Sequence, residues 1–108
     1  MLEKESAVHK KKFFIMDDEL EIARASLCHI ENDLHAKPFG WIEDVFTAES
    51  HRGQGLAKQL LREIITEARE KDYKLILTCT EDLIPFYRSM GFKTVDKTVV
   101  MQMNFPKS

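Results

Sequence analysis

The stretch that most restricts the fold lies near the middle of the chain, at residues 56–68. Its apolar residues recur at a spacing close to 3.6, as on one face of an α-helix, and charged or amide side chains separate them. The apolar set is Leu56, Ala57, Leu60, Leu61, Ile64, Ile65 and Ala68. This pattern predicts an amphipathic helix that packs its apolar face on the rest of the domain.

Two segments that favour strands flank this helix. "WIEDVFTA" at residues 41–48 is rich in β-branched and aromatic residues. "KLILTC" at residues 74–79 is a short apolar run suited to a strand buried on both faces. A strand, a helix and a strand at this separation predict a right-handed βαβ crossover or its splayed variant.

The N-terminal third predicts two further strands, at residues 12–16 and 22–30, joined by an acidic turn at residues 17–19. A loop follows at residues 35–40, "HAKPFG".

The C-terminal third predicts a short second helix in "EDLIPFYRSMGF". Glu81 or Asp82 would cap it, Pro85 would lie in its first turn, and Gly91 would stop it. Alternating residues from 98 to 105 then predict a closing strand, whose exposed edge would suit pairing into a homodimer.

Composition predicts one domain spanning residues 1–108, because 108 residues with 44% hydrophobic content provide a single modest core. Sixteen basic and eighteen acidic side chains leave a formal charge of −2, which excludes a global attraction to nucleic acid or membranes. No apolar run approaches the roughly 20 residues of a membrane helix, and the N-terminus is too charged for a signal peptide. Cys28 and Cys79 fit free thiols without metal-ligand spacing, so we expect a cytoplasmic protein without a metal.

Two glycines stand at the entrance of the central helix, in "SHRGQGLAKQLL". A helix begins with about four N–H groups that lack intrahelical partners and with roughly half a positive charge. Gly53 and Gly55 either make a tight turn or let an anion approach those groups, with Arg52 supplying charge. The P-loop pattern is absent, and Lys58 stands where a dinucleotide fingerprint needs a small residue.

With its surroundings, the segment resembles motif A of the GNAT superfamily of acetyl-CoA-dependent N-acetyltransferases. "WIEDVFTA" matches the fourth strand of that superfamily, "KLILTC" its fifth, and "FYRSMGF" its FYxxxGF block, so the resemblance spans about residues 40–105. It implies an α/β (α+β) fold with a mixed, mostly antiparallel sheet, a splayed central strand pair and helices packed on it. We expect this fold to be truncated at the N-terminus, because the first strand and two helices of the family have almost no room before Lys12.

The resemblance implies acetyl-CoA as cosubstrate. Its pyrophosphate would bind motif A, and its pantetheine arm and thioester oxygen would bind backbone N–H groups of the preceding strand. The implied cofactor-binding residues are Val45, Phe46, Thr47, Arg52, Gly53, Gln54, Gly55, Leu56 and Ala57.

Two residues match catalytic positions of the family. Glu43 would be the general base, with a cross-strand salt bridge as the alternative, and Tyr87 would protonate the leaving thiolate, with a core tyrosine as the alternative. Strand alternation places Asp44 on the face opposite Glu43 unless a bulge intervenes. Cys79 is either an acetylated nucleophile or an inert thiol.

For the basic residues near these positions, the sequence leaves more than one role open. His51 either touches phosphate or is a solvated loop histidine. The three lysines at residues 10–12 are a solvated strand end, or they contact the nucleotide 3′-phosphate or an acidic partner.

"GWIEDVF" is most similar to glucosamine-6-phosphate N-acetyltransferases, which implies a small-molecule primary amine as acceptor. The family's cofactor-contacting Asn is absent at Leu83, and the carboxylate of the sugar-phosphate enzymes is absent near Thr78 and Thr80, which argues against glucosamine 6-phosphate. A protein or peptide N-acetyltransferase and a CoA-binding module without catalysis remain as alternatives.

Overall fold

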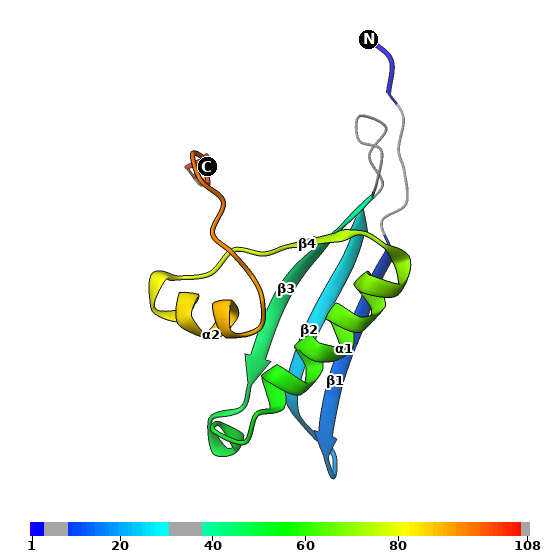
Figure 1. Cartoon of the computed structure of the whole chain (residues 1–108), viewed down its shortest axis with the longest axis vertical. Coiled ribbons are helices and arrows are strands. Elements are labelled where there is room, and N and C mark those ends of the chain that lie inside the picture. Colours follow the sequence, from blue (N-terminus) through cyan, green and yellow to red (C-terminus); the bar gives the residue numbers. More distant parts are fainter. Residues whose placement is uncertain (4–8, 31–37, 107–108) are drawn as a thin grey trace.

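The computed structural model describes residues 1–3, 9–30 and 38–106, and Figure 1 shows how their elements are arranged. The strands are β1 (His9–Asp17), β2 (Leu20–Ile30), β3 (Phe39–Thr47) and β4 (Lys74–Ile76). The helices are α1 (Leu56–Lys71) and α2 (Ile84–Ser89), and the 3₁₀ turns Glu49–His51 and Glu81–Leu83 precede them.

These strands form one sheet in the order β1-β2-β3-β4. The first three strands are antiparallel, and β4 runs parallel to β3. Because α1 lies between β3 and β4 in the sequence, the predicted strand–helix–strand unit is confirmed. The predicted mixed, mostly antiparallel sheet with helices packed on it is confirmed as well.

The apolar stripe of α1 covers one face of the sheet. Leu61 and Ile64 are completely buried and belong to the same core cluster as Leu27 of β2 and Ile42 of β3. Burial of a side chain of this size contributes about 1.5–3 kcal/mol relative to exposure. The helix predicted at residues 56–68 is therefore confirmed, and it continues to Lys71, after which Asp72 adopts the left-handed conformation.

β3 and β4 pair over a short ladder only. The described pairs join Phe39 to Lys74, Gly40 to Leu75 and Trp41 to Ile76. The ladder includes every residue of β4, and after Ile76 the chain leads away from β3, as Figure 1 shows. The predicted splayed strand pair is thus confirmed, and it leaves one side of β3 without a neighbouring strand.

A β-bulge interrupts β3 at Asp44. The register with β2 steps from Ser26–Glu43 to Arg24–Phe46, so two residues of β3 oppose one residue of β2. Asp44 has a φ of 57°, a value that Asp tolerates better than most residues. Ile42 and Val45 both contact the core, and Glu43 and Asp44 both form ion pairs on the face away from α1. Simple alternation, which separates the two carboxylates, is therefore wrong here, because the extra residue resets it.

Several predicted boundaries change in the structure. The strands predicted at residues 12–16 and 22–30 are confirmed but longer, whereas "KLILTC" is a strand only at Lys74–Ile76. The loop predicted at residues 35–40 lies partly outside the described residues, and Phe39 and Gly40 already belong to β3.

For the second helix, the predicted N-terminal cap is wrong, whereas the predicted positions of Pro85 and Gly91 are correct. Glu81 and Asp82 fall inside a 3₁₀ turn, so Leu83 precedes α2 and the prediction of an acidic cap is wrong. Pro85 in the first turn is confirmed, and Gly91 follows the helix with a φ of 103°.

The predicted closing strand is wrong. Residues 98–105 pair with no strand among the described residues, and their apolar side chains lie largely in solvent; Met101 is 88% exposed and Phe105 is 79% exposed. An alternating pattern becomes a strand only where a neighbouring backbone supplies hydrogen bonds. Figure 1 shows this segment leading away from the sheet. Within the described part of the chain, neither helix has the length and apolar character needed to cross a membrane.

Candidate active site

The glycine-rich loop enters α1 with two residues in left-handed conformations. Gly53 has a φ of 83°, and Gly55, which precedes the helix, has a φ of 77°. A Cβ built on either residue would meet no atom within 4 Å. The backbone dihedrals therefore favour glycine at these positions, and the open space on the Cβ side of both residues leaves the loop backbone accessible to an anion.

A cavity of about 230 Å³ opens beside this loop. Its lining joins the end of β3 to the start of α1, and it consists of Thr47, His51, Arg52, Gly53, Gly55, Leu56, Ala57, Lys58 and Phe86. Six of the predicted cofactor-binding residues are thus brought together, whereas Val45, Phe46 and Gln54 do not line the cavity. Sequence reasoning missed Phe86 as a wall, because only the tertiary fold brings α2 to the loop.

Arg52 and His51 attach the loop to the sheet. Arg52 Nε donates a hydrogen bond to the carbonyl oxygen of Thr47 at 3.2 Å. The His51 ring lies between Ser50 Oγ at 2.8 Å and Asp17 Oδ2 at 3.0 Å, which joins the loop to the β1–β2 turn. His51 therefore has a structural role at the cavity wall, in contrast to a solvated loop histidine.

Glu43 lies on the face of the sheet that α1 does not cover. Its Oε1 is 2.9 Å from Lys10 Nζ on β1 and accepts a contact of 3.5 Å from Cys28 Sγ on β2. The Lys10 ammonium, assisted by the Cys28 thiol, lowers the pKa of Glu43. The cross-strand salt bridge considered from the sequence is therefore present, and Glu43 is ionised at neutral pH.

A second ionic group surrounds the bulge. Arg24 Nε donates to Asp44 Oδ2 at 2.8 Å, and the Arg24 guanidinium stacks over the Phe46 ring at 4.4 Å. The same Arg24 also contacts Glu21, which pairs with Lys12. Hydrogen bonding to Arg24 lowers the pKa of Asp44. Asp44 thus holds the bulge in place through β2.

Tyr87 of α2 lies in a different part of the molecule from Glu43. Its side chain is 8% exposed and meets the Phe86 and Phe92 rings edge to face. It lines a hollow of about 150 Å³ together with Cys79, and Glu43 is not part of that lining. Burial raises the pKa of Tyr87, so its phenol stays protonated at neutral pH.

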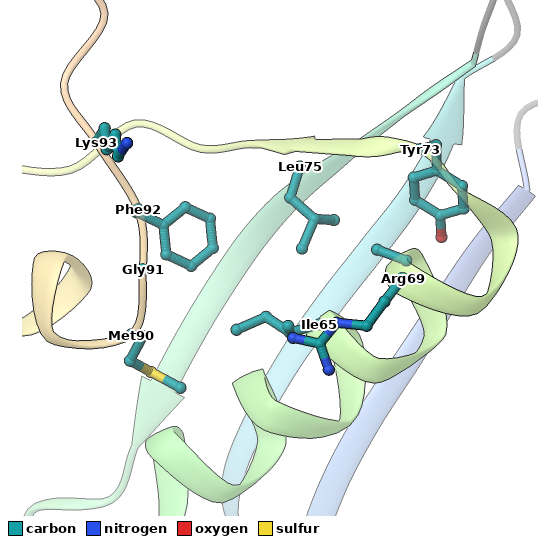
Figure 2. A pocket seen from close by; sticks show the side chains of 9 residues that line it. Ile65, Arg69, Tyr73, Leu75, Met90, Gly91, Phe92 and Lys93 are labelled. Carbon is teal, nitrogen blue, oxygen red and sulfur yellow. The ribbon is translucent and has the colours of Figure 1, made fainter.

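A larger hollow, of about 500 Å³, separates α1 from the segment that follows α2. Figure 2 shows its walls, with Ile65 and Arg69 from α1, Leu75 from β4, and Met90 and Phe92 from the opposite side. No sequence pattern pointed to this hollow, because only the tertiary fold brings the segment after α2 opposite α1 and β4.

Comparison with known proteins agrees with this geometry. Residues 2–92 match the Acetyltransferase (GNAT) family, and the chain belongs to that family.

The similar proteins include sugar-phosphate acetyltransferases. Glucosamine 6-phosphate N-acetyltransferase 1 from Oryza sativa subsp. japonica is 39% identical over 67 residues, which are 61% of this chain and 39% of that protein. Glucosamine 6-phosphate N-acetyltransferase from Trypanosoma brucei brucei is 37% identical over 65 residues, which are 59% of this chain and 44% of that protein. The matched region therefore spans about two fifths of the length of these relatives.

Among solved structures, a Trypanosoma brucei acetyltransferase superposes with a TM-score of 0.74 and 30% sequence identity. The superposition covers 89% of this chain and 69% of that chain.

Proposed function

We propose that this chain transfers an acetyl group from acetyl-CoA to a primary amine of a small molecule. The observation that carries the proposal is the cavity at the entrance of α1, which Thr47 and five of the six motif A residues line together, next to the end of β3. The similarity to glucosamine 6-phosphate N-acetyltransferases supports an amino sugar phosphate as acceptor. The chain has no carboxylate at Thr78 or Thr80, so we propose the wider class of small amines.

The residues of the loop fit the pyrophosphate of acetyl-CoA. Gly53 and Gly55 leave open space for a close approach to the backbone. The first turn of α1 offers N–H groups at the positive end of the helix dipole. Arg52 is exposed, and its hydrogen bond to Thr47 uses Nε only. Val45, Phe46 and Thr47 would bind the pantetheine arm and the thioester oxygen, because past Trp41 no described strand pairs with β3 on the side away from β2.

Glu43 is the proposed general base, acting directly or through water. Its ionised carboxylate can hold the ammonium group of an acceptor and take up a proton from it. Its low pKa makes it a weak base, so part of its role would be electrostatic. Tyr87 is the proposed acid for the departing thiolate, because its raised pKa keeps the phenol protonated until then.

The two proposed groups would act from different sides of the diverging strands. Glu43 faces away from α1, and Tyr87 belongs to the core cluster on the α1 side. A thioester bound along the edge of β3 past Trp41, where the ladder with β4 has ended, would lie at the boundary between these two faces. This arrangement supports a direct transfer in which the acceptor and the cofactor approach from opposite sides.

A thiol-release assay with acetyl-CoA and a panel of amines tests the proposal. We expect Glu43→Gln and Tyr87→Phe each to lower kcat/KM by about 100-fold or more. Asp44→Asn is the matched control for the carboxylate, because Asn tolerates the positive φ at the bulge, and it should keep most of the activity. Unchanged rates in both test variants would remove these assignments.

The panel also separates the alternatives. Acetylation of lysine peptides without acetylation of amino sugars would indicate a protein or peptide N-acetyltransferase. Calorimetric binding of acetyl-CoA without turnover of any amine would indicate a CoA-binding module. Absence of binding at high micromolar concentrations would overturn all three functions.

We further propose that the protein acts in a reducing, cytoplasmic compartment as a homodimer. The free thiols of Cys28 and Cys79 support the compartment. The exposed apolar side chains of residues 98–105 support a dimer that covers this segment. Light scattering of the full chain and of a chain ending at residue 97 tests the dimer. We expect a dimeric mass for the full chain and a monomeric mass for the shortened one, and a monomeric mass for both would contradict the proposal.

A further inference from the structure

A buried hydroxyl lies at the end of α1 that is far from the glycine-rich loop. Tyr73 follows the helix and is only 7% exposed. Its ring lies above Gly40, where an added Cβ would come within 2.7 Å of Tyr73 Cε2. Its hydroxyl oxygen has no hydrogen-bond partner among the described residues. An unpaired buried hydroxyl costs about 1–3 kcal/mol, so this atom is a candidate ligand contact.

A hollow of about 280 Å³ adjoins this tyrosine at the start of β1 and the end of α1. Figure 2 shows the hydroxyl turned away from β4 and toward α1. Leu27 and His29 of β2 line the hollow, and the His29 ring meets the Tyr73 ring edge to face at 5.2 Å. The other lining residues are His9, Lys10, Lys11, Glu67 and Lys71.

The charges around the hollow favour an anion. Three lysines line it, and Glu67 is the one carboxylate among its described lining residues. Lys10 is paired with Glu43 on the other face of the sheet, whereas Lys11 and Lys71 both contact Glu67. Two ammonium groups on one carboxylate leave an excess of positive charge. Burial raises the pKa of the Tyr73 phenol, and the Glu67 carboxylate adds to this effect, so the hydroxyl stays protonated and can donate a hydrogen bond.

We propose that this hollow binds a phosphate dianion, either free or as the monoester of a small metabolite. The Tyr73 hydroxyl would donate a charge-assisted hydrogen bond to a phosphate oxygen, and Lys11 and Lys71 would divide their charge between the phosphate and Glu67. The site is distinct from the cofactor loop, because the 16 residues of α1 separate the two by about 24 Å. Neither motif A nor the proposed catalytic pair takes part in it.

An NMR titration of the full chain with inorganic phosphate, at an ionic strength matched with sodium chloride, tests the proposal. We expect saturable shifts of the His29 ring and the Tyr73 amide signals. Tyr73→Phe should raise the dissociation constant about tenfold. Lys71→Gln should also weaken binding, whereas the control Lys97→Asn, which removes an exposed lysine from a turn, should not.

Two further measurements complete the test. Glycerol 3-phosphate in place of phosphate identifies the source of the anion: tighter binding indicates a phosphomonoester, and equal binding indicates the free ion. Acetyl-CoA affinity should be the same in Tyr73→Phe and the wild type, which separates this site from the proposed activity. The proposal would be overturned if Tyr73→Phe and the wild type bound phosphate with equal affinity, or if the NMR shift changes were confined to residues 52–57.

Discussion

Gly40→Ala adds one methyl group where the structure has no room for it. The new Cβ would lie 2.7 Å from Leu27 Cδ1, 2.7 Å from Tyr73 Cε2 and 2.9 Å from Leu75 Cδ2, whereas ordinary contacts begin at 3.4 Å. The φ of Gly40 is outside the left-handed region, so alanine fits the backbone. The substitution therefore tests packing alone, at the short ladder from which β3 and β4 diverge.

Overpacking of a core costs about 1–3 kcal/mol. Three close contacts, two of them with residues of the buried core cluster, place Gly40→Ala in the upper part of that range. Replacing glycine by alanine also stabilises the folded state by about 0.4–1 kcal/mol, because alanine lowers the conformational entropy of the unfolded chain. We expect a net loss of about 2 kcal/mol in the free energy of unfolding, and a melting temperature lower by roughly 10 °C.

Urea denaturation followed by circular dichroism measures this loss. Gly91→Ala is the matched control, because its Cβ meets nothing within 4 Å and its cost comes only from a φ of 103°. In the Gly40→Ala background, Leu75→Ala should cost at least 1 kcal/mol less than in the wild type, since it makes room for the methyl. A Gly40→Ala protein as stable as the wild type, or equal costs of Leu75→Ala in both backgrounds, would refute the reasoning.

Three other variants test the loop, the ion pair and the buried phenol. Gly55→Ala should lower stability by about 1–2 kcal/mol through its positive φ and weaken acetyl-CoA binding in calorimetry, and full affinity would contradict the proposed cradle. Lys10→Gln should lose stability between the ordinary carboxyl pKa and the ordinary lysine pKa, where both partners are charged. This loss should shrink as pH falls through the lowered pKa of Glu43 or rises through the raised pKa of Lys10. A deficit in urea titrations that does not change with pH argues against the pair. Tyr73→Phe should leave stability unchanged or raise it by up to about 1 kcal/mol, whereas a clear loss would reveal a partner for the hydroxyl.

Local patterns were sufficient where one element determines the outcome. The period of the apolar residues identified α1, because a helix needs only its own backbone hydrogen bonds and one apolar face. Gly53 and Gly55 identified the loop, because positive φ angles depend on the residue itself. The splayed strands and the family followed from the order of matched segments, and both were confirmed.

Only the tertiary structure decided what depends on contacts between distant segments. The bulge at Asp44 arises from register with β2 and places Glu43 and Asp44 on one face, against simple alternation. The Lys10–Glu43 pair sets the charge state of the proposed base from a strand 33 positions away in the sequence. Residues 98–105 alternate like a strand and form none, because no strand in the described part of the chain pairs with them. The sequence by itself determined the helix, the glycine loop and the family, since these depend on local geometry. The register, the ion pairs and the cavities depended on which strands and helices contact one another, and those contacts are decided only when the whole chain packs.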